Sequence, residues 1–323
     1  MSDAAQCTIS EQRGETGRPG VPLAFVHRAR GEDAFVTDWQ RTAAEGSFAV
    51  SGRWPGAHPF TPSVDLTYDP LLVAETMRQA GILIVHAAYA LPLEYRFLLS
   101  KLRYSCVPEL LRVDAWPADV DILVRCSDIV WRGLRPRSMK VAMTVRRGGN
   151  VVARGDVDAE FINPGTYVRL RGDRAVPRSW VSPAAPVRPL LAGRTRADDV
   201  LIAPTPDPCQ WLLRVDTAHP VLFQGRKDHV PGMLLLEAAR QAASALRSPT
   251  PFVPAGGEIT FQRYAEFDVP CLIRAERPAA DGGIRISGEQ NGAPVFSATL
   301  QERALLDPPV EAGTLVGTGG RSM

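Results

Sequence analysis

Two stretches of the chain carry apolar residues at the spacing of a buried helix. The first, residues 69–81, reads DPLLVAETMRQAG, and it stays apolar on nearly every side as far as Ala90. A helix with apolar residues all round must be buried. Asp69 is suited to the N-cap and Pro70 to the first helical position, and Pro92 ends the helix. The pattern therefore predicts a long central helix.

The second stretch repeats the first. Residues 231–243 read PGMLLLEAARQAA and predict a helix that begins at Pro231-Gly232 and ends near Arg247. Five positions are identical in the two stretches: Leu72/Leu234, Glu75/Glu237, Arg78/Arg240, Gln79/Gln241 and Ala80/Ala242. A His-Pro pair precedes each helix, at His58-Pro59 and at His219-Pro220. These matches predict two copies of one fold, with an offset of 162 residues between the two glutamates.

Short alternating runs with strand character surround each helix. In the first copy they are residues 33–36, 47–50, 121–126, 139–146 and 151–161, and in the second 199–202, 211–215, 258–262, 269–275, 284–287 and 295–302. Gly148-Gly149-Asn150, Gly282-Gly283 and Asn291-Gly292 stand between such runs and are typical of hairpin turns. One long helix against an antiparallel sheet, made twice, is an α+β architecture.

The chain divides into five parts by composition. We expect a disordered segment over 1–21, a first domain over 22–171, a linker over 172–189, a second domain over 190–304 and a flexible tail over 305–323. The linker prediction depends on its four prolines, Pro177, Pro183, Pro186 and Pro189.

Charge and hydropathy exclude several classes of protein. The 37 Lys and Arg residues nearly balance the 35 Asp and Glu residues, so the basic excess that dominates nucleic-acid binding is absent. No run approaches the roughly 18 apolar residues that a membrane helix needs. The polar start lacks the apolar core of a secretory signal. We therefore expect a cytoplasmic protein with neither a nucleic-acid nor a membrane partner.

Motifs for metals and cofactors are also missing from the sequence. The five cysteines are scattered without C-x-x-C spacing, which predicts neither a disulfide framework nor a zinc site: Cys7, Cys106, Cys126, Cys209 and Cys271. Neither a G-x-x-x-x-G-K-[ST] nor a G-x-G-x-x-G phosphate loop is present. We expect no metal and no cofactor.

The surroundings of the second helix resemble a known fold. A His-containing turn at His219-Pro220, then Asp228-His229-Val230-Pro231-Gly232 and Glu237-Ala238, is similar to the hotdog fold of hydroxyacyl-carrier-protein dehydratases and thioesterases. The chain resembles the A-factor biosynthesis (AfsA-type) family more closely, over about residues 22–303, because that family carries two such repeats. The resemblance implies a tandem hotdog fold whose copies form an intramolecular pseudo-dimer, with either a monomer or a homodimer in solution.

This resemblance also implies an activity. Members transfer a β-ketoacyl group from an acyl-carrier-protein or coenzyme A thioester to the hydroxyl of dihydroxyacetone phosphate. The ester is a precursor of γ-butyrolactone or butenolide signalling molecules. Two alternatives stay open: a hotdog dehydratase or thioesterase, and a non-catalytic ligand-binding regulator of secondary metabolism. The Phe-Pro-Gly that follows the dehydratase histidine is absent here, because Pro220-Val221-Leu222 follows His219.

Acyl transfer needs a base and a cation for the phosphate. Glu75 and Glu237 are candidate catalytic bases, because burial in an apolar helix would raise a carboxyl pKa toward the working pH. Alternatively, each glutamate pairs with the arginine three residues further on, across one helix face. Arg240 is our preferred ligand for the phosphate, and Arg78 is the second candidate.

The two helix starts differ at the position that would bind a thioester oxyanion. Gly232 offers a backbone N–H at a helix N-terminus, whereas Pro70 has none. In hotdog dimers the site lies between protomers, so the resemblance implies that Glu75 meets His219 and Gly232 across the pseudo-dimer. The mirror pocket would pair His58 with Glu237.

Three histidines remain after this assignment. His229 is a candidate for a polar substrate contact at the pocket mouth, with Asp228 holding it. His27 and His86 are expected to be structural.

Overall fold

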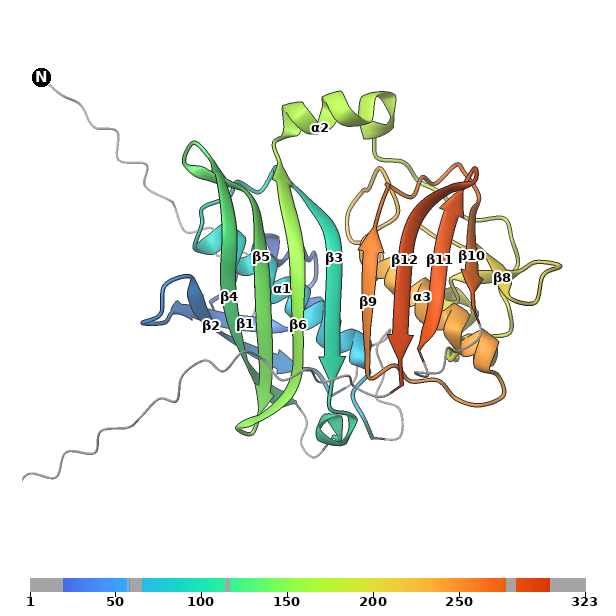
Figure 1. The fold of residues 1–323 in the computed structure, drawn as a ribbon, viewed down its shortest axis with the longest axis horizontal. Coiled ribbons are helices and arrows are strands. Elements are labelled where there is room, and N and C mark those ends of the chain that lie inside the picture. The colour runs from blue at the N-terminus through green and yellow to red at the C-terminus, as the bar shows by residue number, and fades with distance from the viewer. Residues whose placement is uncertain (1–19, 57, 59–65, 114–116, 277–282, 303–323) are drawn as a thin grey trace, which may run out of the picture.

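The computed structural model describes residues 20–56, 58, 66–113, 117–276 and 283–302 (Figure 1). The first copy contains β1 (Val36–Arg41), β2 (Ser47–Trp54), α1 (Pro70–Ala87), β3 (Arg96–Cys106), β4 (Ala118–Arg132), β5 (Arg135–Arg147) and β6 (Asn150–Ile162). After the connecting helix α2 (Pro164–Arg171), the second contains β7 (Ile202–Pro204), β8 (Gln210–Leu213), α3 (Gly232–Arg247), β9 (Gly256–Phe261), β10 (Cys271–Ala275), β11 (Ile284–Gln290) and β12 (Ala293–Gln301). The predicted tail over 305–323, Gly282 and most of the predicted segment 1–21 lie outside the described residues.

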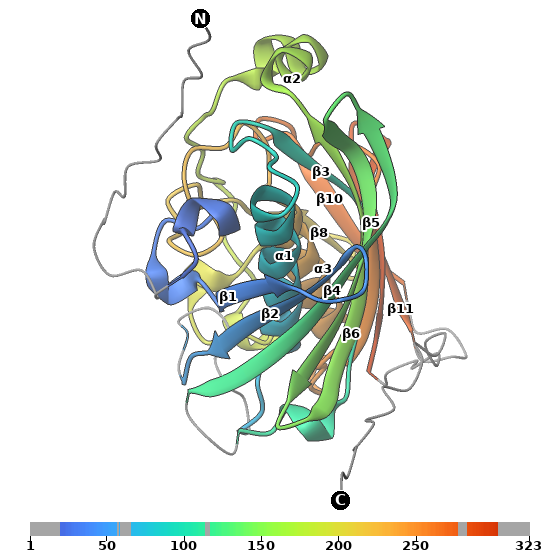
Figure 2. The ribbon, with the colours of Figure 1, turned by 90° about the vertical axis from the view of Figure 1, so that its left-hand side faces the viewer.

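All these strands join in one antiparallel sheet with internal symmetry. The order is β1-β2-β4-β5-β6-β3 in the first copy, and β9-β12-β11-β10-β8-β7 continues it with the equivalent strands reversed. The copies meet where β3 pairs with β9, from Lys101 opposite Thr260 to Ser105 opposite Gly256. Figure 1 shows the strands in front of α1 and α3, and Figure 2 shows the sheet curving around α1. The α+β prediction with two copies in a pseudo-dimer is confirmed.

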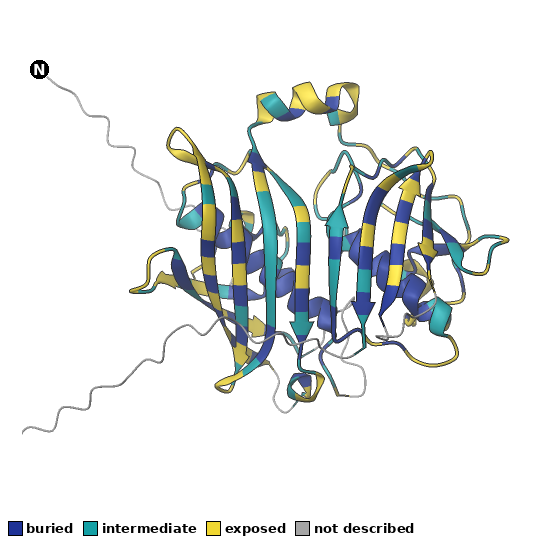
Figure 3. Cartoon of the chain, in the orientation of Figure 1, coloured by how far each residue is buried: buried dark blue, intermediate teal, exposed yellow. Residues whose placement is uncertain are grey.

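Alternation along the strands decides which face of the sheet is buried. In β11 buried and exposed residues alternate without interruption, and the first nine residues of β4 do the same (Figure 3). Since successive side chains point to opposite faces, one face packs on the helices while the other meets solvent. The side chains on the inner face include Ile122, Met143, Ile286 and Phe296, and each of these is at most 2% exposed.

The two central helices begin in different ways. In α1, Asp69 accepts a hydrogen bond from the Leu71 N–H at 2.8 Å, and Pro70 occupies the first helical position. In α3, Pro231 precedes the helix and no side chain caps its N–H groups. The first helix also ends earlier than expected, at Ala87, because the chain turns at Ala90, which adopts a left-handed conformation. The N–H groups of Leu234 and Leu235 bond to the Pro231 carbonyl, whereas those of Gly232 and Met233 at the very start of the helix can bind a ligand.

A short helix that the sequence did not predict lies just before the predicted linker. Helix α2 is capped by Asn163, whose side chain accepts from the Thr166 N–H at 2.9 Å. Its last residue, Arg171, is 8% exposed and binds both Asp228 and Glu266 of the second copy. The connection is therefore fastened to the second domain by buried ion pairs. Among the described helices, none is long and apolar enough to cross a membrane.

We expect alanine substitutions at two glycines, one facing α1 and one within it, to change the stability in opposite directions. A methyl group on Gly155 of β6 would lie 2.6 Å from Met77 Sδ and 2.7 Å from the Arg103 carbonyl oxygen, whereas one on Gly81 would meet nothing within 4 Å. We expect Gly155→Ala to lower the free energy of unfolding by about 1–3 kcal/mol. Gly81→Ala should raise it by about 0.5–1 kcal/mol, because alanine favours helix. Urea unfolding of both variants measures this, and a stable Gly155→Ala protein would contradict the packing described.

Candidate active site

A buried carboxylate at the centre of α1 collects three side chains. Glu75 Oε1 accepts from Arg28 Nε at 3.0 Å, from Arg78 Nη2 at 2.8 Å and from Gln79 Nε2 at 2.7 Å. Its Oε2 accepts from Arg78 Nε at 2.8 Å. The carboxylate is therefore shared between an arginine of its own helix and Arg28, which lies before β1.

The second copy repeats this arrangement on α3. Glu237 Oε1 accepts from Arg194 Nε at 2.9 Å, from Arg240 Nη2 at 2.7 Å and from Gln241 Nε2 at 2.6 Å. Its Oε2 accepts from Arg240 Nε at 2.7 Å. Arg28 and Arg194 thus occupy equivalent places. No local motif marks either arginine, although the two are 166 residues apart, the same offset as Asp33 and Asp199.

The recurrent glutamine explains why the helices hold the segments that precede the first strands. Gln79 accepts from the Phe35 N–H at 2.7 Å and donates to the Asp33 carbonyl at 2.7 Å. Gln241 makes the same pair of contacts with Leu201 and Asp199, at 2.7 and 2.8 Å. The matching residues of the repeat therefore form a network that fastens chain to helix in both copies.

This network corrects one expectation about the glutamates. Burial does act to raise the pKa of Glu75, but the charges of Arg28 and Arg78 outweigh it and lower the pKa to about 2. Arg194 and Arg240 have the same effect on Glu237, whose pKa is also about 2. The expectation of a raised pKa was wrong, and the alternative pairing with the arginine three residues further on is what the structure contains.

The two predicted His-Pro histidines are also held by carboxylates. His58 Nε2 lies 2.9 Å from Asp33 Oδ1, and His219 Nε2 lies 3.1 Å from Asp199 Oδ1. The other ring nitrogen of His219 accepts the backbone N–H groups of Val221 and Leu222, so both of its nitrogens are engaged.

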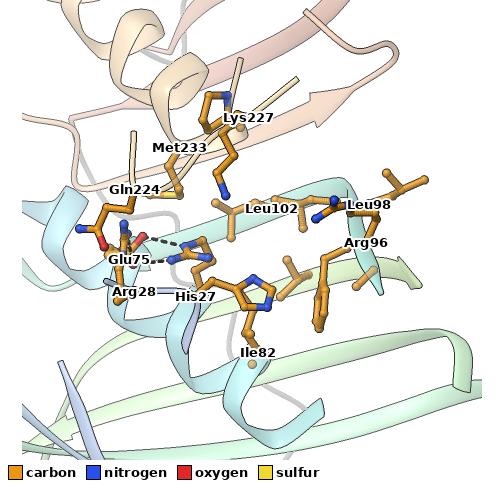
Figure 4. Close-up of a pocket in the computed structure, with 18 of the residues that line it drawn as sticks. His27, Arg28, Glu75, Ile82, Arg96, Leu98, Leu102, Gln224, Lys227 and Met233 are labelled. Atoms are coloured by element: carbon orange, nitrogen blue, oxygen red, sulfur yellow. Dashed lines mark hydrogen bonds and ion pairs between the residues drawn. The ribbon is translucent and has the colours of Figure 1, made fainter. Parts of the chain in front are cut away.

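A cavity of about 460 Å³ lies between the copies, beside α1. Its floor is apolar, with Leu71, Met77, Leu102, Val141, Phe161 and Met233 among the lining residues. Its polar wall is formed by Glu75, Arg28 and Arg78, together with Arg96 at the start of β3. Figure 4 shows Glu75 and Arg28 on one side of this space, with Lys227 and Met233 approaching from the second copy. Side chains from both copies thus build one pocket.

The start of α3 forms part of the same wall. Pro231, Gly232 and Met233 line the cavity, so the uncapped helix N-terminus faces it. A methyl group on Gly232 would approach Phe261 Cζ to 3.0 Å, which shows how closely this turn packs on β9. The structure therefore brings Glu75 and Gly232 into one pocket across the pseudo-dimer.

An aspartate holds His229 at the cavity wall. Asp228 Oδ1 lies 2.8 Å from His229 Nδ1, while Asp228 Oδ2 accepts from the Tyr167 hydroxyl at 2.5 Å and from Arg171 Nε at 3.3 Å. Burial acts to raise the pKa of Asp228, but hydrogen bonds from His229 and Tyr167 and the charge of Arg171 hold it well below its usual range. The ionised carboxylate only accepts, so His229 Nδ1 donates and Nε2 is left as an acceptor. Tyr167 of α2 is a site residue that the sequence did not indicate.

His27 lines the cavity, and His86 contacts His27 without lining the cavity itself. His86 Nδ1 donates to the Leu91 carbonyl at 2.7 Å, and its Nε2 lies 2.9 Å from His27 Nε2. His27 is therefore the donor in that contact, because His86 has already committed its proton. Burial, followed by the charge of Arg78, lowers the pKa of His27 to about 3, so the ring is neutral.

The structure separates the predicted site residues into two groups. Those that line the cavity are Glu75, Arg78, Gly232, His58 and His229. The remaining three, Glu237, Arg240 and His219, are outside its lining. Glu237 is fully buried, and Arg240 reaches the Ala192 carbonyl and Ser244 rather than the cavity. Within the described residues, no group of three or more His, Cys, Asp or Glu side chains is placed to hold a metal ion.

A long helix under an antiparallel sheet, paired with a second such unit, defines a double hotdog protein. The chain belongs to the A-factor biosynthesis hotdog domain family, whose model matches residues 12–163 and 177–304. The expected resemblance is confirmed in both copies.

Relatives and a solved structure agree with this assignment. A 2-oxo-3-(phosphooxy)propyl 3-oxoalkanoate synthase of Streptomyces coelicolor is 46% identical over 285 residues, which cover 87% of this chain and 90% of that protein. A protein of the same name from Streptomyces virginiae is 44% identical and matches 88% of this chain and 97% of its own length. The structure of an oleoyl thioesterase from Lactobacillus plantarum has a TM-score of 0.50 at 13% identity, covering 81% of this chain and 98% of that one, and it supports the fold.

We expect the free energy of unfolding to fall by different amounts when the charge of Glu75 or of Glu237 is removed. Glu237→Gln would remove the nearest counter-charge of Arg194 and Arg240, at sites 5% and 11% exposed, and leave only the more distant Asp69, 3.7 Å from Arg194. Breaking such a buried pair costs about 3–5 kcal/mol. Glu75→Gln should cost less, because Arg78 is 21% exposed beside the cavity. Chemical denaturation of both variants measures the difference, and an equal loss would show that the first network is as closed as the second.

Acid should weaken both networks together. Each glutamate has a pKa near 2 in the folded protein, below the ordinary value of 4.5. A depressed carboxyl pKa contributes stability that is fully present above about pH 4.5 and is lost as the pH falls toward 2. We expect the free energy of unfolding to fall across that window. The slope should be shallower in Glu75→Gln, and an unchanged slope would indicate that other groups control acid unfolding.

Proposed function

We propose that the protein transfers a β-ketoacyl group from a thioester to the hydroxyl of dihydroxyacetone phosphate in the cavity beside α1. The name of the two Streptomyces relatives describes the ester of a 3-oxoalkanoic acid with that alcohol. The donor is a β-ketoacyl thioester of an acyl-carrier protein or coenzyme A, and the reaction takes place in the cytoplasm.

One observation supports this function most directly. The cavity joins an apolar floor to a polar wall that carries an uncapped helix start and an oriented histidine. The floor suits an acyl chain, since binding sites for small molecules combine apolar walls with a few placed polar groups. The N–H of Gly232 lies at the positive end of the α3 dipole, where a thioester oxyanion is stabilised.

His229 is our candidate for the base. Its Nε2 takes the proton of the dihydroxyacetone phosphate hydroxyl as the oxygen attacks the thioester carbonyl carbon. The C–O bond forms, the carbonyl oxygen carries the negative charge near Gly232, and the C–S bond then breaks. The departing thiolate recovers the proton from His229, so ester and thiol are produced without a covalent enzyme intermediate. Asp228 fixes the tautomer that this step requires.

Glu75 has a positioning role in this proposal. A carboxylate with a pKa near 2 is a weak base at neutral pH, but it fixes the two guanidinium groups of Arg28 and Arg78 at the cavity wall. We assign Glu237 and Arg240, which lie outside the lining, to the support of the second copy. The cavity beside α1 is thus the working member of the two equivalent sites.

Dependence on the acceptor tests the reaction. The protein is incubated with a β-ketoacyl thioester, with and without dihydroxyacetone phosphate, and thiol and ester are measured by absorbance and mass spectrometry. We expect thiol release that requires the acceptor and equals the ester formed. Thiol release without the acceptor would indicate a thioesterase, and saturable binding without release would indicate a regulator. In a parallel incubation with a β-hydroxyacyl thioester, loss of water would indicate a dehydratase.

Substitutions of His229, and of the residues that hold it, test the assignment of His229 as the base. We expect His229→Gln to lower kcat by about 10²–10⁴-fold, the usual contribution of general base catalysis, with little change in either KM. Asp228→Asn should also lower kcat, because an amide can donate to Nδ1 and favour the wrong tautomer. Tyr167→Phe should have a milder effect, since it removes a hydrogen bond to Asp228 and a longer contact with His229 Nδ1 but leaves the Asp228–His229 bond in place. A His229→Gln enzyme that folds and turns over at the normal rate would remove this residue as the base.

A further inference from the structure

The cavity contains more positive than negative charge. Each acidic side chain that lines it already has a basic partner: Asp33 binds Arg30, Glu75 binds Arg28 and Arg78, and Asp228 binds Arg171. Three further cations line the same cavity, Arg96, Arg226 and Lys227. Within the part of the chain that the structure describes, none of these three forms an ion pair with an acidic group. The cavity wall thus has a surplus of cations.

Lys227 is the least expected of these cations. It lies in the loop before α3, and it is half-buried at the cavity wall. Burial, together with the nearby charges of Arg78, Arg96 and Arg28, lowers its pKa to about 8. Figure 4 shows Lys227 reaching from the second copy into the cavity, with Arg96 on one side and the Glu75–Arg28 group on the other. The charge of the adjacent Asp228 offsets this lowering of the pKa only in part, because that carboxylate is already bound to His229, Tyr167 and Arg171. A lysine among arginines is therefore stabilised when a further anion joins it.

The surrounding arginines come from different elements of the fold. Arg78 lies on α1, where its two bonds to Glu75 fix the guanidinium. Arg96 begins β3 and stacks on the Tyr167 ring, with its Cζ 5.4 Å from the ring centroid. Two planar donor groups and one ammonium therefore approach a common space from a helix, a strand and a loop.

We propose that Lys227, Arg96 and Arg78 form a subsite for the phosphate of a phosphate monoester. The choice of dihydroxyacetone phosphate as that monoester rests on the proposed function, whereas the phosphate subsite itself does not. The phosphate dianion of a monoester carries three terminal oxygens and two negative charges. It therefore matches three cationic groups better than a carboxylate ligand, which has two oxygens and one charge. Lys is a point charge for phosphate, and Arg supplies a fork of donors.

The loop that carries Lys227 also sets the direction in which the acceptor binds. Lys227 and His229 are separated by one residue, and both line the cavity. Dihydroxyacetone phosphate has its phosphate and its free hydroxyl at opposite ends of a short carbon chain. A phosphate on Lys227 thus leaves the hydroxyl to reach the neighbouring His229 and the start of α3.

Two acceptors that differ only in the phosphate test the subsite. Transfer to dihydroxyacetone phosphate and to dihydroxyacetone is compared in the wild type, Lys227→Met and Arg96→Met. We expect both variants to raise KM for the phosphorylated acceptor by about 10- to 100-fold, the range for a lost bond to a charged group. Transfer to dihydroxyacetone should change less than twofold. Lys140→Met is the matched control, since Lys140 is 60% exposed and pairs with Asp128 on the outer sheet. Equal losses with both acceptors would overturn the subsite.

Covalent labelling gives a readout that does not require transfer. Pyridoxal 5′-phosphate presents a phosphate and an aldehyde, which forms an imine with an unprotonated amine and is then fixed by borohydride. The chain has three lysines, and Lys101 and Lys140 are both ion-paired. We expect labelling at neutral pH to fall mainly on Lys227, and inorganic phosphate to protect it. Peptide mass spectrometry measures the extent at each lysine.

The two experiments separate the subsite from the reaction. Protection of Lys227 by inorganic phosphate in a protein that transfers no acyl group would support the subsite and reject the proposed function. Active transfer with equal labelling of all three lysines and no protection would reject the subsite alone. Lys227→Met should fold at least as stably as the wild type, because it removes a cation from among arginines.

Discussion

A carboxylate buried in the middle of an apolar helix cannot stay ionised without cations, and this requirement organises both halves of the molecule. Glu75 and Glu237 each need two guanidinium groups, one from the same helix and one from a segment that precedes the first strand. The arginine from outside the helix draws that segment onto α1 or α3. The neighbouring glutamine then fixes the segment by its backbone. One charge therefore determines where the chain enters each sheet.

The same network has different consequences in the two copies because the opposite helix starts differ. Beside Glu237 lies the start of α1, where Asp69 caps the helix and is 3.7 Å from Arg194. Beside Glu75 lies the start of α3, where no side chain closes the N-terminus. The site beside Glu75 is therefore open to a ligand, whereas the site beside Glu237 is completed by protein groups. Both copies therefore contain the supporting network, and the cavity of about 460 Å³ lies beside the network of Glu75.

The architecture could be predicted from the sequence, but only some of the residues of the site could. The repeat predicted two copies, both central helices and the contrast between Gly232 and Pro70, because these features lie in contiguous stretches. Arg28 and Arg194 escaped notice because they are 47 and 43 residues from their glutamates, so no local pattern joins them. Comparison of the two copies at the offset of Asp33 and Asp199 would have found both. Tyr167 could not be found in this way, because its helix follows β6, and the residues after the equivalent strand β12 lie outside the described part of the chain beyond residue 302.

The pairing of β3 with β9 joins two halves of a single chain, so dilution cannot separate them. The cavity uses groups from both copies, so in a protein of two separate chains the site would disassemble whenever the subunits parted. Here the sheet is continuous from β1 to β7, and a buried connection through Arg171 joins the halves. The effective concentration of one half for the other is set by the chain and not by the amount of protein in the cell. Each molecule would therefore carry a complete site even at high dilution.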